Sequence, residues 1–185
     1  DYWIVKVDAN GSKQWDRRFG GSGTEELCNV CPTVDGGYLL CGRSFSGAEG
    51  DKTEASRGGA DFWIVKTDAV GTKQWDRRFG GDSFEMGCVV QQAADGGYIL
   101  GGQTLSGISG DKTEASRGAN DYWIVKVAAN GTKQWDRRFG GDDDDYLRAV
   151  QPTVDGGYIL SGDSISGANG DKTESVRGAL DYWIV

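Results

Sequence analysis

The sequence predicts an all-β fold, and three features favour this class. The 185 residues include 31 glycines but only 2 prolines, and 11% of them are aromatic. This composition is typical of short strands joined by tight turns, rather than of long helices or a disordered polar chain. The chain also repeats itself with a fixed period, and each repeat divides into short β-like runs separated by turn signals.

A 60-residue repeat organises the whole chain. Residues 1–60, 61–120 and 121–180 align without a gap, and residues 181–185 begin a partial fourth copy. The segment Lys-Gln-Trp-Asp-Arg-Arg-Phe-Gly-Gly stands unchanged in all three copies, at residues 13–21, 73–81 and 133–141. We predict a single repeat domain over residues 1–185, and we expect it to be part of a longer array. Such sameness indicates recent duplication, so identity between copies does not by itself mark function.

Four strands are predicted in each repeat. In the third copy they cover residues 122–127, 133–139, 147–153 and 157–161. The Asn130-Gly131 turn joins the first two and the Asp155-Gly156-Gly157 turn joins the last two, because both supply residues that tolerate positive φ. The strands therefore form an antiparallel meander. Four is also the number of strands in one blade of a β-propeller. An open β-repeat array is the alternative.

One strand of each repeat is apolar on both faces. In the first copy Tyr2 and Ile4 lie on one face, with Trp3 and Val5 on the other. A two-layer sandwich leaves one face of a strand in solvent, so this pattern favours a sheet packed between two neighbouring sheets. The repeated Trp and Tyr side chains, such as Trp3 and Tyr38, are therefore assigned to the core between sheets rather than to a sugar-stacking surface.

The following strand, at residues 13–19, is mostly charged. Its lysine, glutamine, aspartate and two arginines surround the apolar anchors Trp15 and Phe19. This pattern predicts an outermost strand, whose charges keep the exposed edge from pairing with other chains.

The repeat resembles a known family. Three stretches show the resemblance: Asp-Tyr-Trp-Ile-Val-Lys-Val at 121–127, Phe-Gly-Gly-Asp at 139–142 and Asp-Gly-Gly-Tyr-Ile-Leu-Ser-Gly at 155–162. With them the chain resembles the SBBP-type repeat of bacterial seven-bladed β-propellers, and related repeats of secreted, surface-sorted proteins of Bacteroidetes-like bacteria. The resemblance covers all but the loop at 50–60 and its copies. It implies a propeller and an extracellular or cell-surface location, but no catalytic or binding residue.

Composition excludes several classes of function. The formal net charge is −8 and the pI is about 4.6, which argues against nucleic-acid binding because that affinity comes from clustered Lys and Arg. No apolar run approaches the roughly 20 residues that cross a bilayer. The chain has no histidine, so neither a zinc site nor a histidine-based catalytic pair is expected.

The long connections are predicted to gather on one face of the array, which makes that face the candidate ligand site. A ring of acidic and basic side chains there could bind polyhydroxylated ligands or a hard cation. The favoured interpretation is that these side chains pair locally and fix the loops. The candidates are Asp51, Lys52, Glu54, Arg57, Asp111, Lys112, Glu114, Arg117, Asp171, Lys172, Glu174 and the arginine of the last loop, which is assigned to position 178.

A second set of acidic residues raises a calcium hypothesis. Four aspartates are adjacent at residues 142–145, and carboxylate oxygens are the ligands that Ca²⁺ prefers. The candidate metal residues are Glu25, Glu85, Asp142 and Asp145, although no known calcium-loop spacing is present. Calcium is the one cofactor that the sequence suggests.

The four cysteines leave two readings open. Cys31 and Cys41 lie about equally far from the turn at 35–37, so they could be bonded across two strands. Buried free thiols are the favoured alternative. Cys28 and Cys88 occupy the same place in their repeats, where the third copy has Arg148.

These observations favour a non-catalytic interaction module of a secreted or cell-surface bacterial protein, which binds glycan or protein through its loop-rich face. A structural repeat of an extracellular assembly or fibre is one alternative. A fragment of a propeller hydrolase or lyase is another. Propellers usually have at least four blades, so further repeats, or a homo-oligomer that completes the ring, are also expected.

Overall fold

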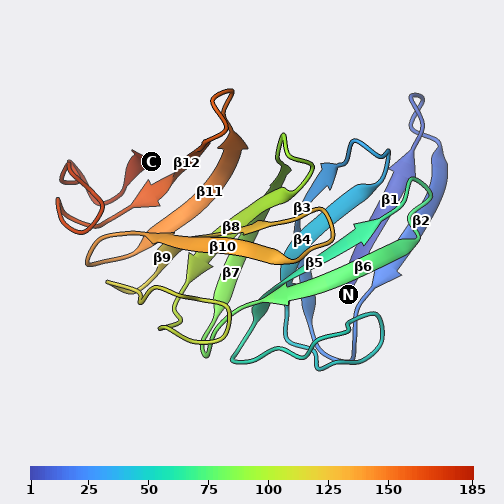
Figure 1. Cartoon of the computed structure of the whole chain (residues 1–185), viewed down its shortest axis with the longest axis horizontal. Coiled ribbons are helices and arrows are strands. Elements are labelled where there is room, and N and C mark those ends of the chain that lie inside the picture. Colours follow the sequence, from blue (N-terminus) through green and yellow to red (C-terminus); the bar gives the residue numbers. More distant parts are fainter.

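The computed structural model describes all 185 residues and contains strands but no helix, so no helix could span a membrane (Figure 1). The strands of the first half are β1 (Tyr2–Val7), β2 (Lys13–Phe19), β3 (Glu25–Pro32), β4 (Tyr38–Ser44), β5 (Asp61–Thr67) and β6 (Lys73–Phe79). Those of the second half are β7 (Glu85–Gln92), β8 (Tyr98–Thr104), β9 (Asp121–Val127), β10 (Lys133–Phe139), β11 (Asp145–Pro152), β12 (Tyr158–Ser164) and β13 (Asp181–Ile184).

The strands form four antiparallel sheets. Sheet I is β1-β2, sheet II is β3-β4-β5-β6, sheet III is β7-β8-β9-β10 and sheet IV is β11-β12-β13. The predicted all-β class and antiparallel meander are confirmed. Each 60-residue repeat is shared between two sheets, because its first two strands end one sheet and its last two begin the next.

The tight turns match their prediction, whereas several strand boundaries differ, as in the strand predicted at 147–153, which covers Asp145–Pro152. Gly36 and Gly131 have φ of 82° and 81°, which an L side chain rarely adopts. The strand predicted at 157–161 extends to Ser164. The strand continues because Gly162 pairs with Leu147, at a bulge where a Cβ would overlap the Tyr146 carbonyl.

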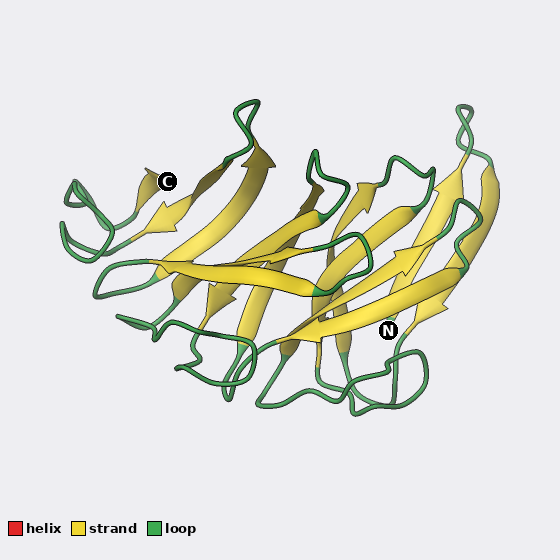
Figure 2. Ribbon diagram, viewed as in Figure 1, coloured by secondary structure: helices red, strands yellow, loops and turns green.

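The sheets stand side by side in an open row, from β1 and β2 at the right of Figure 1 to β11 and β12 at the left. Strand β7 lies against β3 and β4, and β11 lies against β7 and β8. Figure 2 shows the turns that follow β3, β7 and β11 along one edge of the row, and the long loops along the opposite edge and at its C-terminal end. The row is not a closed ring.

Three apolar cores lie between the four sheets. At each junction an aromatic ring of one sheet packs on a tryptophan of the next: Tyr2 on Trp63 at 4.8 Å, and Phe62 on Trp123 at 5.5 Å. Every residue of β5 and β9 is buried, as predicted for a strand with two apolar faces. The assignment of Trp3 to a core is wrong for this structure, because Trp3 is 66% exposed in sheet I, which lies at one end of the row.

The charged strands β2, β6 and β10 lie at sheet edges, as predicted. The Arg17 guanidinium stacks over Trp15 at 5.6 Å, and Arg77 repeats this contact over Trp75 at 6.0 Å. The stems and planar heads of these arginines thus cover apolar surface while the edge stays charged.

A bond between Cys31 and Cys41, one of the two readings of the cysteines, is wrong. The hairpin is centred on Asp35, so Cys31 pairs with Leu39, and Cys41 lies opposite Asn29. Cys41 is instead bonded to Cys88 of β7, which joins sheet II to sheet III with a Cα–Cα distance of 5.7 Å. The favoured alternative, buried free thiols, holds for Cys31 but is wrong for the bonded Cys41, and Cys28 is free and exposed. Burial raises the pKa of the Cys31 thiol.

Candidate functional site: the loop network between neighbouring sheets

The long loops and the connections between sheets meet on one face. The loop at 45–60 touches the connection at 20–24, because the Asp51 N–H donates to the Gly20 carbonyl at 2.9 Å. The same bond recurs from Asp111 to Gly80 at 3.0 Å, and from Asp171 to Gly140 at 3.1 Å. The candidate ligand residues therefore lie where two connections of the chain are pinned together.

The three candidate lysines point inward. Lys52, Lys112 and Lys172 are 3%, 2% and 6% exposed. The Lys52 ammonium donates to the Ser46 carbonyl at 2.9 Å and to the Ser56 hydroxyl at 2.7 Å, so it ties the two ends of its own loop together. Burial lowers the pKa of Lys52 and of Lys112, although nearby carboxylates oppose that shift. Lysines held in this way do not present their charge to a ligand.

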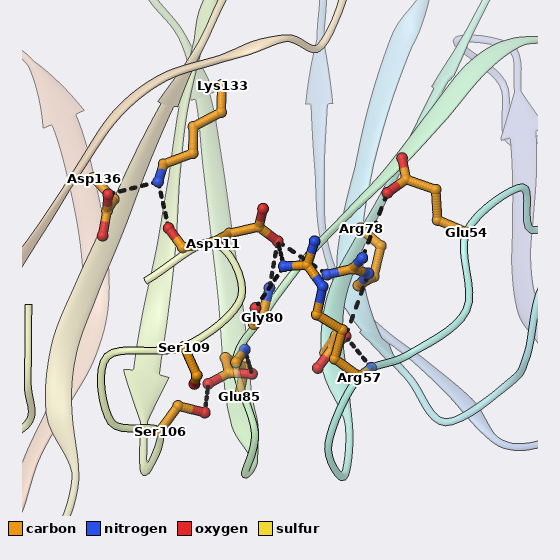
Figure 3. A network of polar contacts seen from close by, with 12 residues as sticks. Glu54, Arg57, Arg78, Gly80, Glu85, Ser106, Ser109, Asp111, Lys133 and Asp136 are labelled. Atoms are coloured by element: carbon orange, nitrogen blue, oxygen red, sulfur yellow. Dashed lines mark hydrogen bonds and ion pairs between the residues drawn. The ribbon is translucent and has the colours of Figure 1, made fainter. Parts of the chain in front are cut away.

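The candidate aspartates and arginines link one loop to the next (Figure 3). The Asp111 carboxylate accepts from Arg57 of the preceding loop at 2.8 Å, from Arg78 at 3.0 Å and from the Gly80 N–H at 3.2 Å. Asp171 repeats the arrangement, with Arg117 and Arg138 each at 2.9 Å.

The first loop lacks part of this arrangement, and the candidate glutamates differ between loops. The Asp51 carboxylate accepts only the Gly20 N–H, at 3.1 Å, and has no arginine partner. Glu54 lies 3.6 Å from Arg78, whereas Glu114 accepts the N–H of Arg138 at 2.8 Å.

The last loop corrects one assignment made from the sequence. The assignment of its arginine to position 178 is wrong, because that position is Gly178 and the 60-residue period carries Arg117 to Arg177. The Arg177 N–H donates to the Asp181 carboxylate, as the equivalent N–H does in the two earlier loops. Neither Arg177 nor Glu174 forms a side-chain ion pair of the kind that Arg57 and Glu54 make.

The candidate metal residues occupy separate positions instead of one centre. Glu85 accepts from the Thr104 and Ser106 hydroxyls, both at 2.7 Å, and from the Gly81 N–H at 3.1 Å. Burial raises the pKa of this carboxyl. The carboxylates of Glu25 and Asp145 are placed likewise, on Ser46 and Ser166. Each of these carboxylates therefore accepts hydrogen bonds from a hydroxyl at or just after the end of the neighbouring strand, and so holds the two segments together.

The four adjacent aspartates also diverge. The carboxylate of Asp144 accepts from Asn120, at 3.0 Å to its N–H and 2.6 Å to its amide nitrogen, whereas Asp145 turns to the Gly141 N–H at 2.8 Å. Asn169 beside Asp142 lowers the pKa of that exposed carboxyl. No group of three or more carboxylates or cysteines is placed to hold a metal ion.

Sequence reasoning missed a buried carboxylate in the charged strands. Asp76 is 1% exposed and accepts from the Trp63 indole at 3.0 Å, the Lys73 ammonium at 2.8 Å and the Thr53 N–H at 2.9 Å. Although burial alone would raise the pKa of Asp76, these donors lower it. Asp136 has the same partners in the next sheet. One sequence signal could have indicated this contact: Trp63 and Asp76 have the same separation as Trp123 and Asp136 in the next repeat.

The first glycine of each Phe-Gly-Gly motif is needed because carboxylates crowd it. A Cβ on Gly80 would lie 2.7 Å from Glu85 Oε2 and closer still to the Asp61 carboxylate. Gly80→Ala is therefore expected to destabilise the chain by about 1–3 kcal/mol, as overpacking does. Thermal denaturation checks this against Gly107→Ala, whose Cβ would meet nothing within 4 Å. Equal melting temperatures for the two variants would contradict the crowding.

No family model and no curated protein matches the chain. Among solved structures, 94% of the chain aligns with 57% of a protein of unknown function from Bacteroides caccae, at 12% identity and a TM-score of 0.47. The chain thus spans little more than half the length of that protein.

Proposed function

We propose that the chain is a non-catalytic structural repeat module of the β-propeller type, belonging to a secreted or cell-surface bacterial protein. One observation carries this proposal. The charged side chains of the loop-rich face are bonded to neighbouring loops and strands, and the bonds around Asp111 recur around Asp171. These are the positions expected of contacts that hold neighbouring sheets together, so Asp111, Asp171 and the arginines bonded to them already have partners within the chain.

The arrangement of strands supports the propeller part of the proposal. The first strands of successive sheets contact one another, as β3 does with β7 and β7 with β11. The last strands, β6 and β10, instead lie at the free edges of their sheets. Inner first strands and outer last strands are the radial order of propeller blades.

The Cys41–Cys88 bond supports the proposed location. Disulfides persist in oxidising, extracytoplasmic compartments and are rare in the cytosol. The bond joins two sheets rather than two residues of one loop, so its formation fastens adjacent units of the repeat.

The structural role is tested at Asp111. Asp111→Asn removes the charge that holds Arg57 and Arg78, and because Arg57 is 40% exposed the two ion pairs together contribute about 1–2 kcal/mol. We expect the melting temperature to fall by about 5 °C. Asp51→Asn is the matched control, because Asp51 holds the same place in its loop without an arginine partner, and it should change the melting temperature little.

A ligand-binding role predicts the opposite pattern. If Asp111 served a glycan or protein ligand, Asp111→Asn would melt like Asp51→Asn. Its only defect would then be in ligand capture, and that result would overturn the proposal.

A further inference from the structure

Two buried carboxyl groups from different sheets meet at the junction between sheets II and III. Asp61 is the first residue of β5 and Glu85 is the first of β7, and both are 0% exposed. A Cβ on Gly80 would lie 2.7 Å from Glu85 Oε2 and closer still to Asp61 Oδ1, so these two oxygens are within about 5 Å of each other. Gly80 and Glu85 lie together in Figure 3.

One oxygen of this pair has no hydrogen-bond donor. Asp61 Oδ2 accepts the Arg57 N–H at 2.9 Å and lies 3.5 Å from Arg78 Nε. Asp61 Oδ1, in contrast, is buried and accepts no hydrogen bond. A buried carboxylate oxygen without a donor, next to a second carboxylate, is unfavourable because it is shielded from water and the like charges repel.

The junction between sheets III and IV repeats this arrangement. Asp121 of β9 and Asp145 of β11 are both 0% exposed, and their carboxylates converge on Gly140. Here each carboxylate has a buried oxygen without a donor, Asp121 Oδ1 and Asp145 Oδ1. The Arg117 N–H donates to Asp121 Oδ2 at 2.7 Å, as the equivalent N–H does in the first pair. The carboxyl pair therefore belongs to the repeat and not to one copy of it.

We propose that each of these two carboxyl pairs shares one proton, which makes the contact between neighbouring sheets sensitive to pH. A proton taken up from solvent on Asp61 Oδ1 turns an acceptor without a partner into a donor that faces the Glu85 carboxylate. It also removes one of two like charges from a buried site. Adjacent carboxyl groups of this kind titrate as a unit and hold their first proton tightly.

Basic side chains surround each pair, but other partners already engage them. Arg57 and Arg78 both bind the Asp111 carboxylate, and the Lys52 ammonium donates to groups of its own loop. The charged groups around the first pair are Lys52, Glu54, Arg57, Arg78, Asp111 and Lys112, and those around the second are Lys112, Glu114, Arg117, Arg138, Asp171 and Lys172.

The pKa shifts give the direction of the pH effect. Burial raises the pKa of Asp61 and of Glu85, and the Asp61 charge adds to the rise at Glu85. Burial also raises the pKa of Asp121. A carboxyl group with a raised pKa in the folded chain stabilises that chain fully below the pKa of the unfolded chain, about 4, and this stabilisation is lost as the pH rises through the folded pKa. The lowered pKa of Asp76 acts below about pH 4, outside this window.

Thermal denaturation of the full chain between about pH 5 and about pH 8 tests the inference, and we expect the melting temperature to be about 5 °C higher at the acidic end. Infrared spectra give a second readout that needs no variant. The folded chain should show the carbonyl stretch of a protonated carboxylic acid near about pH 6, where an ordinary Asp or Glu is ionised, and should lose it as the pH rises. A melting temperature that stays constant or rises with pH over this range would overturn the inference. So would the absence of the protonated-acid band.

Asp61→Asn locates the effect. The amide supplies a permanent donor toward Glu85 and does not titrate, so this variant should lose about half of the rise in melting temperature on acidification, one junction of two. Asp51→Asn makes the same chemical change on the same face and should keep the full rise. A full rise in Asp61→Asn would contradict the shared proton. The inference goes beyond the proposed function, and none of these results would alter that function, which is tested by the melting temperature of the Asp111 variant.

Discussion

Asp76→Ala is expected to lower the free energy of unfolding by about 3–5 kcal/mol, the usual effect of removing one partner of a buried ion pair. The alanine leaves the Trp63 indole N–H, the Lys73 ammonium and the Thr53 N–H without their common acceptor. Each of these donors loses its partner at a site where the removed carboxylate was 1% exposed. Urea denaturation measures the loss, and the melting temperature should fall by roughly 10 °C.

Asp16→Ala is the matched control. Asp16 has the same place in the repeat and the same tryptophan and lysine partners, but its side chain is 40% exposed and receives no loop N–H. We expect little change in the melting temperature of this variant. If Asp16→Ala and Asp76→Ala destabilised the chain equally, the stabilisation by this aspartate would come from contacts within the strand pair and not from the loop that covers it.

Acid pH provides a second readout of the same carboxylate. The pKa of Asp76 is lowered in the folded chain, so its stabilising contribution is fully present above the pKa of the unfolded chain, about 3.9. That contribution is lost as the pH falls through the lower pKa of the folded state. The stabilities of wild type and Asp76→Ala should therefore converge on acidification below pH 4. A gap that stays constant would show that the variant acts by another route.

The strands and their order could be predicted because the signals are local. Apolar strand residues, Asp-Gly-Gly and Asn-Gly turns, and the repeat period all act within one hairpin or one unit. The burial of individual side chains could not be predicted, since identical segments differ in it. Trp3 is 66% exposed and Trp63 is fully buried, although both stand in an apolar strand of the same pattern. Trp63 is covered by Tyr2 of the neighbouring sheet, a contact that a local pattern does not specify.

The candidate site was predicted in position but not in role. The sequence placed the charged loop residues on one face, where they do lie. It could not decide between ligand contacts and mutual pairing, because both uses require the same carboxylates, ammonium groups and guanidinium groups. Arg57 and Asp111 are 54 positions apart in the chain, and only the packing of two sheets brings them to 2.8 Å. The burial of Lys112 likewise depends on neighbours that local patterns do not specify.

Loss of the Cys41–Cys88 bond is expected to destabilise the chain by about 3–4 kcal/mol, because the bond closes a long loop of the unfolded chain. The two residues are 47 positions apart and join sheets II and III across an apolar core that contains both of them. The change is made by the double substitution Cys41→Ala and Cys88→Ala, or by a reducing agent. Thermal denaturation should show the same fall in both cases, and the reducing agent should have no further effect on the double variant.

Cys28→Ala is the control for this experiment, since Cys28 holds the same place in its repeat as Cys88 but is exposed and free. It should melt like the wild type, with or without reductant. The other two junctions of the row have no disulfide, so reduction should weaken one junction and leave the aromatic and charged contacts of its neighbours intact. If reductant does not change the melting temperature of the wild type, the disulfide does not contribute to stability. That result would also remove the main structural support for an oxidising compartment, because a chain that gains nothing from the disulfide would be equally stable where thiols stay reduced.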